Sequence, residues 1–326
     1  MITAHPALPV FRPALAWVSA HLDAFHPDHE FVSDHSLRVK PFIELVFVLN
    51  PFLRRGLHHS EPGLAELAAF CARTFDSYDF AAFAQQDPAG LIVFALRDEF
   101  DALCGRAPRD GLLERFRQTG LPELVRVSRT PYRAMDLAYS VARAGLHFDP
   151  RSLLPDLPRT VLGAARPLPH CTDSDLYSVT HTLFYLADLG EADLAACWPD
   201  VAGWPDVAGL RELLRGALGL TLREGNADLS GELLMCLAFL GDTDSRAVRY
   251  AWTRLAALQL PCGAVPAPSY RAVRDDSAGS EAGHYRFTQC YHTTLVMLGA
   301  AMPVLVGAPL SPVTLNPATL NMEAAS

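Results

Sequence analysis

Lysine is almost absent from this sequence: Lys40 is the only one among 326 residues, and the other basic side chains are arginines. No stretch concentrates basic residues and the net charge is −9, so the composition gives no electrostatic reason to bind nucleic acid. The seven cysteines are widely spaced without a C-x-x-C pair, which is typical of reduced, buried thiols. We therefore expect no nucleic-acid partner and no disulfide framework.

Segments that direct or anchor a protein outside the cytoplasm are also missing. The N-terminus, M-I-T-A-H-P-A-L-P-V, lacks the basic and apolar regions of a signal peptide. The most apolar runs, 42–49 and 293–310, are too short or too interrupted by glycine and proline to span a bilayer. No G-x-G-x-x-G, P-loop, G-x-S-x-G or H-E-x-x-H motif occurs, so nothing predicts a nucleotide cofactor or a serine hydrolase. We expect a cytoplasmic protein without a membrane span or a cofactor.

Apolar residues recur at helical spacing along most of the chain, and no run of alternating strands and hairpin turns interrupts them. The pattern predicts an all-α protein. Residues 1–37 are expected to form an irregular N-terminal lead with one helix, residues 38–310 a single domain, and residues 311–326 a disordered tail. The predicted helices that matter below cover 14–25, 39–55, 61–83, 91–103, 130–145, 173–190, 226–241 and 287–302.

The helix predicted over 173–190 (D-S-D-L-Y-S-V-T-H-T-L-F-Y-L-A-D-L-G) is apolar on most of its sides, so the polar residues in its middle should be buried. Tyr177 and His181 lie four residues apart and therefore share one face. Asp175 stands in the first turn, where the helix dipole favours a carboxylate. The D-S-D start weakly resembles the D-x-D-D acid motif of class II terpene cyclases, but Leu176 replaces its last aspartate, and such a start is more often a plain cap.

Four predicted helices end in a glycine, at Gly145, Gly190, Gly241 and Gly299, with spacings of 45, 51 and 58 residues. Each interval contains the end of one helix, a second shorter or more polar helix, and the start of the next. This repetition is typical of stacked helical hairpins. It predicts an α/α toroid, in which the hairpins surround a central axis.

Polar residues occupy equivalent positions in these four helices. Because positions nine and thirteen residues before each glycine are four apart, they share a helix face, which in a toroid would point toward the axis. The alternative is that some of these faces point to solvent and that the glycine alignment is accidental. Asp136, His181, Glu232 and Cys290 stand nine residues before the glycines, and Tyr132, Tyr177, Asp228 and Arg286 stand thirteen before.

Two histidines lie within apolar helices and are each followed by threonine: His181 in T-H-T and His292 in Y-H-T-T. A buried histidine can act as an acid or a base near neutral pH, although a single one is more often a hydrogen-bonded core residue. The glycine alignment matches His181 to Cys290, whereas the H-T alignment matches it to His292, and the sequence leaves this register open. Cys290 and His292 are two residues apart on a helix and should not share one ion, so a third ligand would have to be Cys236 or Glu232. We therefore expect no metal site.

The segments D-L-Y-S-V-T-H-T-L-F-Y-L-A-D-L-G, S-G-E-L-L-M-C-L and Y-H-T-T-L-V together resemble an uncharacterised family of bacterial, actinomycete-type all-helical proteins, some encoded near natural-product genes. The resemblance covers about residues 38–305 and implies a terpenoid-cyclase-like α/α toroid with His181, Glu232 and His292 as motif residues. We interpret the chain as an enzyme of specialised metabolism whose central pocket, lined by these three residues with Tyr177 and Asp175, performs acid/base chemistry on a hydrophobic small molecule or a peptide. The alternative is a non-catalytic scaffold that holds a peptide or lipid for a partner enzyme.

Overall fold

The structure is a computed structural model that describes residues 5–29, 38–86, 91–107, 131–144, 150–163, 167–198, 205–277 and 282–306. All secondary-structure elements in these ranges are helical, so the all-α prediction is confirmed. The predicted disordered tail, 311–326, lies outside the described residues. The elements are α1 (Leu8–Ala20), α2 (Leu22–Phe25), α4 (Lys40–Arg54), η1 (Leu57–His59), α5 (Pro62–Ser77), α6 (Phe80–Gln86), α7 (Leu91–Leu103), α10 (Pro131–Ala144), η3 (Pro150–Arg159), η4 (Leu168–His170), α11 (Asp173–Leu186), η5 (Asp188–Gly190), α12 (Leu194–Cys197), α13 (Val207–Glu224), α14 (Ala227–Phe239), α15 (Arg246–Leu258), α16 (Ala272–Ser277) and α17 (Ala282–Val306).

Side-chain caps fix where several of these helices begin. Thr172 and Asp175 form a reciprocal capping box at the start of α11, and Asn226 accepts a hydrogen bond from the Leu229 backbone N–H at the start of α14. Each cap satisfies a backbone donor that would otherwise have no partner within the helix. The beginnings of the two helices that bear His181 and Glu232 are therefore set by local sequence.

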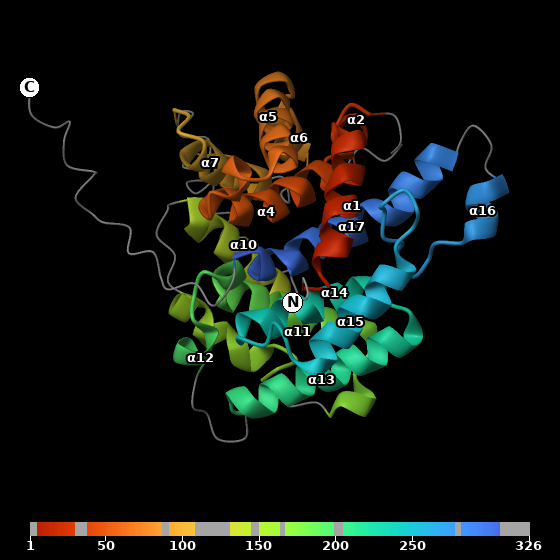
Figure 1. Cartoon of the computed structure of the whole chain (residues 1–326). Coiled ribbons are helices and arrows are strands. Elements are labelled where there is room, and N and C mark those ends of the chain that lie inside the picture. Colours follow the sequence, from red (N-terminus) through yellow and green to blue (C-terminus); the bar gives the residue numbers. More distant parts are fainter. Residues whose placement is uncertain are drawn as a thin grey trace, which may run out of the picture.

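Six helices contact one another in a closed cycle. In order, α4 packs against α7, α7 against α10, α10 against α11, α11 against α14, α14 against α17, and α17 against α4 again. Figure 1 shows α17 near the middle of the molecule, between α4 above it and α14 below it. Helices α13 and α15 pack against α14 from outside the cycle. The three helices predicted to end at Gly145, Gly190 and Gly241 are thus consecutive neighbours, followed by α17.

The N-terminal lead is built into the same core as the rest of the chain. Helix α1 packs against α17, α5 and α15, and its Phe11 and Trp17 are buried in the main hydrophobic cluster. The helix begins at Leu8 instead of the predicted residue 14, because Pro9 occupies its first turn and Pro13 is accommodated inside it.

The prediction that the last helix ends at Gly299 is wrong, because α17 continues through this residue to Val306. A Cβ atom at Gly299 would lie 2.9 Å from the Met235 sulfur on α14. Gly299 is therefore required by the close approach of two helices, whereas Gly190 and Gly241 adopt the positive φ angles, 90° and 79°, that favour glycine after a helix.

Helix α17 is also the one helix of the described ranges that is long and apolar enough to cross a membrane by length and composition. In the structure, 61% of its apolar window is buried by the rest of the chain. It packs against α1, α4 and α14, which are the contacts of a core helix.

A buried network of ion pairs connects three helices of the cycle with η5. Arg54 of α4 and Arg143 of α10 share Glu99 of α7 and Asp188 of η5, with nitrogen–oxygen distances of 2.8 to 3.3 Å. Tyr139 donates a further hydrogen bond of 2.9 Å to Asp188. Since the four charges balance in sign, the network joins four neighbouring elements without leaving a net buried charge.

Candidate functional site

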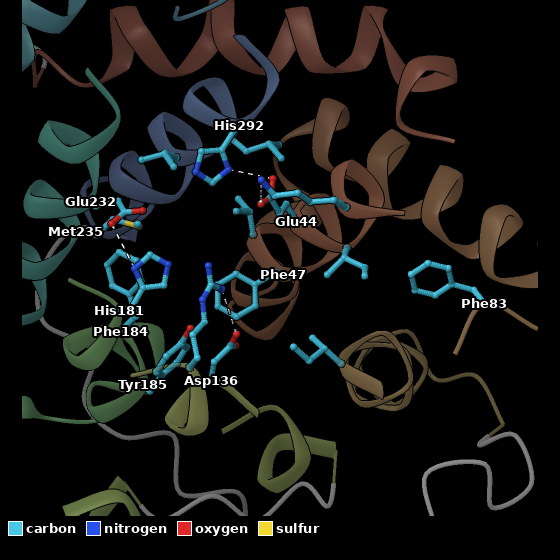
Figure 2. A pocket seen from close by; sticks show the side chains of 17 residues that line it. Glu44, Phe47, Phe83, Asp136, His181, Phe184, Tyr185, Glu232, Met235 and His292 are labelled. Carbon is cyan, nitrogen blue, oxygen red and sulfur yellow. Dashed lines mark hydrogen bonds and ion pairs between the residues drawn. The ribbon is translucent and has the colours of Figure 1, made fainter. Parts of the chain in front are cut away.

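All six helices of the cycle line one cavity of about 290 Å³. Figure 2 shows polar side chains gathered on one side of it, where His292 faces Glu44 and His181 faces Glu232. The polar lining residues are Lys40, Glu44, Arg133, Asp136, His181, Glu232 and His292. The remaining wall is mostly apolar and consists of Ile43, Phe47, Val48, Phe83, Ile92, Phe184, Tyr185, Met235, Leu295 and Val296.

His181 is held by one ring nitrogen. Its Nδ1 lies 2.8 Å from the backbone carbonyl of Tyr177, one helical turn earlier, and 3.6 Å from Glu232 Oε2. Burial and the Arg133 guanidinium lower the pKa of His181 to about 4, so its imidazole is neutral at neutral pH. A neutral imidazole has one N–H, and the carbonyl of Tyr177 fixes it on Nδ1. Nε2 is then an acceptor, and it makes no hydrogen bond to any residue of the described ranges.

Glu232 lies deeper, with 2% of its surface exposed. Its Oε2 accepts a hydrogen bond of 2.5 Å from the Thr180 hydroxyl, whereas Oε1 has no hydrogen-bond partner among the described residues. Burial and the nearby Asp228 carboxylate raise the pKa of Glu232 to about 8. In a protein without a bound cation, this carboxyl group therefore holds a proton near neutral pH.

His292 of α17 pairs with a carboxylate from α4, its neighbour in the cycle. Its Nδ1 lies 3.0 Å from Glu44 Oε2, and its Nε2 lies 3.6 Å from Asp228 Oδ1. Burial opposes the charged imidazolium, but the Glu44 carboxylate and Asp228 outweigh it and raise the pKa of His292 to about 9. Burial likewise opposes ionisation of Glu44, but His292 and Lys40 lower the pKa of this carboxyl group.

Asp228 was not among the predicted site residues, although it shares a helix face with Glu232 four residues later. It accepts hydrogen bonds from the Tyr177 hydroxyl at 2.5 Å and from the Thr293 hydroxyl at 3.2 Å. Asp228, Glu232 and His292 each place one possible ligand atom within 4.8 Å of the others. Glu232 and His292, which line the cavity, therefore form a cluster of three potential metal ligands with Asp228, which lies outside the lining.

The structure settles the register that the sequence left open. His292 lines the cavity, whereas Cys290 is fully buried elsewhere, close enough to Asp275 and Arg286 for their charges to affect its pKa. Tyr177 lies behind the cavity wall as the donor to Asp228.

Asp175 was predicted in the pocket, but the structure places it at the start of α11. There its Oδ2 accepts hydrogen bonds from the backbone N–H and the hydroxyl of Thr172, both at 2.8 Å. Its role in the structure is that of a cap, and it is not among the residues that line the cavity.

Glu44 is the second residue that the sequence analysis missed. It is a single carboxylate within the otherwise apolar stretch F-I-E-L-V-F of the helix that became α4. A lone charge in such a stretch needs a partner when the helix is buried, which is a signal that could have identified it.

A second polar pair, on α10, lies close enough to His181 for its arginine to affect the pKa of that histidine. Arg133 and Asp136 of α10 pair at 3.7 Å, and Figure 2 shows Asp136 next to Tyr185. The arginine side chain is half-exposed. The polar lining of the cavity thus extends from His292 past His181 to Arg133 and Asp136 of α10.

These features define a helical domain with a central cavity and a buried acid–base cluster. The chain belongs to the family described as Domain of unknown function (DUF6895), which it matches over residues 11–302. The match includes α17 as far as Met302, the other five helices of the cycle in full, and every residue of the cluster. No curated protein and no solved structure matches the chain.

Proposed function

We propose that the protein is a cytoplasmic enzyme of specialised metabolism that performs acid/base chemistry on a small, largely apolar substrate in this cavity. The observation that supports the proposal most strongly is the meeting of His181, Glu232 and His292, from three different helices, at the polar side of one apolar-walled cavity. Glu232 is buried, and the two histidines beside it are partly buried. Gathering ionisable groups where little solvent reaches them is costly to the fold, and such groups are concentrated at active sites.

The ring of six helices supports an α/α toroid of the terpenoid-cyclase-like type. Its closed order of contacts leaves one central cavity, and each of its helices contributes side chains to the lining. Reactive groups at the centre of such a ring are partly screened from water by the surrounding helices, with the His181 side chain 21% exposed. A dry environment strengthens the electrostatic interactions that acid/base catalysis uses.

His181 is the group we assign to proton transfer with the substrate. Its Nδ1–H is fixed by the Tyr177 carbonyl, so Nε2 is available to accept a proton from a bound molecule. The cluster of Glu232 and His292 then lies beside the reacting atoms and stabilises the charge that develops on them. Tyr177 acts as a positioning residue through its hydroxyl on Asp228.

The volume of the cavity and its mostly apolar lining indicate which class of substrate it could hold. A volume of about 290 Å³ lies at the lower end of the range for small-molecule sites, which is roughly 300 to 1,000 Å³. This favours a hydrophobic small molecule over a long peptide. Its apolar body would contact side chains such as Phe47 and Val296, and one polar group would face His181.

The test compares metabolites of producing strains that express the wild type, His181→Ala or His59→Ala. His59 is an exposed histidine of η1 and serves as the matched control. We expect His181→Ala to fold normally and to reduce formation of the product by roughly 10²–10⁴-fold, the usual contribution of an acid/base group. His59→Ala should leave the metabolite pattern unchanged.

The same experiment distinguishes the enzyme from a scaffold. If His181→Ala and His292→Ala both fold and the metabolite pattern does not change, the catalytic assignment is wrong. The chain would then hold a peptide or lipid for a partner enzyme without reacting with it.

A further inference from the structure

We infer that Asp228, Glu232 and His292 bind one divalent transition-metal ion at the polar side of the cavity. The sequence led us to expect no metal, because Cys290 and His292 diverge on their helix and a third ligand was missing. In the structure, the missing third ligand is Asp228. His292 is joined by Asp228 and Glu232 of α14, and Cys290 is not part of the group. The inference goes beyond the proposed function, because an ion can bind here whether or not a reaction takes place.

The positions of the three ligands are fixed by two helices that pack against each other. Asp228 and Glu232 are four residues apart on α14 and project from the same face. Helix α17 packs directly against α14 and adds the imidazole of His292. The three ligand atoms lie within 4.8 Å of one another. Ligands at about 2.0–2.2 Å from an ion are somewhat closer together, so small side-chain rotations complete the site.

Each ligand is oriented by a second residue, as ligands of metal sites usually are. Glu44 accepts the hydrogen bond of His292 Nδ1 at 3.0 Å, which turns Nε2 toward Asp228. The carboxylate of Asp228 accepts two hydroxyl hydrogen bonds, and that of Glu232 accepts one from Thr180. A carboxylate bound to the far nitrogen of a metal-ligating histidine is a recurrent arrangement.

Two atoms remain available for a ligand, one on the buried Glu232 and one on His292, whose side chain is 39% exposed. Glu232 is 2% exposed, and its Oε1 has no hydrogen-bond partner among the described residues. His292 Nε2 is 3.6 Å from its nearest carboxylate oxygen, on Asp228, which is too long for a hydrogen bond. An unpartnered oxygen in a buried carboxylate, beside a second buried carboxylate, is what a cation would satisfy.

The ligands indicate the class of metal. Two carboxylate oxygens and one imidazole nitrogen favour zinc, manganese or iron, because magnesium and calcium prefer oxygen ligands alone. Three protein ligands leave at least one coordination position for water or substrate, as in catalytic metal sites. That position would lie on the side of the cavity, which Glu232 and His292 line.

The experiment uses the full-length protein, stripped of metal with a chelator and then titrated with ZnCl₂ or CoCl₂. Elemental analysis after gel filtration should find about one ion per chain in the wild type, and Tm should rise as the site fills. Asp228→Asn and His292→Ala should lose this stoichiometric binding. Cys290→Ala, the matched control from the rejected register, should keep it. Glu44→Gln should weaken binding by roughly 10–100-fold, the usual effect of removing an orienting residue.

A spectrum of the cobalt-loaded wild type gives an answer even if a variant fails to fold. Cobalt bound to oxygen and nitrogen ligands gives ligand-field bands without the intense thiolate charge-transfer band that a cysteine ligand would add. The inference is overturned if the wild type retains no stoichiometric metal, if a folded Asp228→Asn or His292→Ala binds as the wild type does, or if the thiolate band appears.

Discussion

The buried charge network around Asp188 offers a quantitative test of how the helix cycle is held together. In Asp188→Asn, the side chain keeps its shape, and asparagine tolerates the positive φ of 48° at this position. The substitution removes one of two carboxylates that neutralise Arg54 and Arg143. Arg54 and Asp188 are each only 8% exposed, so solvent cannot replace the lost charge.

The expected loss follows from this burial. Burial raises the pKa of Asp188, so the carboxylate itself gains little from folding, and the cost comes from the arginines that lose their partner. Removing one partner of a buried ion pair typically costs about 3–5 kcal/mol. At about 2 °C per kcal/mol for a large domain, Tm should fall by roughly 6–10 °C. Removing the excess charge as well, in Asp188→Asn combined with Arg143→Met, should recover part of the loss.

The assay is urea and thermal unfolding followed by circular dichroism. Asp244→Asn is the matched control, because Asp244 forms an even shorter pair with Arg249, at 2.7 Å, but is 66% exposed. Because solvent screens this pair, the loss of stability in the control should fall within the error of the unfolding measurement. If Asp188→Asn costs no more than this control, the network does not stabilise the cycle and the argument from burial is wrong.

Two further substitutions test the packing and the polar side of the cavity. Gly231→Ala places a methyl group against Met297 where α14 and α17 meet and should destabilise the fold by about 1–3 kcal/mol, whereas Gly219→Ala, with nothing within 4 Å, should be neutral or stabilising in thermal unfolding. Equal effects of the two would contradict the close approach of these helices. Tyr177→Phe removes the hydroxyl from Asp228 and should cost about 1–3 kcal/mol in urea unfolding. A loss below about 0.5 kcal/mol would mean that this hydrogen bond does not hold the aspartate.

The sequence predicted the helices and much of the cavity because both depend on local pattern. Counting back from each glycine placed Asp136, His181 and Glu232 on the helix faces that were predicted to point toward the axis. These three residues do line the cavity. The method worked for the helices near Gly190 and Gly241, where glycine marks the end of a helix through its positive φ.

The same method failed at the last helix because glycine has a second use. Gly299 lies within α17, where the absence of a side chain admits Met235, so counting from it selected Cys290 instead of His292. Nothing in a single sequence separates a glycine that ends a helix from one that lets another helix approach. Only the three-dimensional packing makes the distinction.

Contacts between helices that are far apart in the sequence could not be predicted from local sequence patterns either. Glu44 and His292 are 248 residues apart, and their pairing depends on α4 and α17 closing the cycle. Asp228 was noted as one of eight polar positions, but its role depends on Tyr177 and Thr293 from two other helices. Periodicity predicts which face of a helix a residue occupies. It cannot predict which other helix will pack against that face.

The central claim is that a small molecule reacts at His181 inside the helix cycle. The most direct measurement incubates purified wild type and His181→Ala, each with and without added zinc, in a metabolite extract from a strain that lacks the gene. Mass spectrometry should find one compound consumed and one formed by the wild type, whereas His181→Ala should bind the same compound without converting it. If the wild type consumes nothing under either condition, or if His181→Ala converts the compound at the same rate, the claim is contradicted.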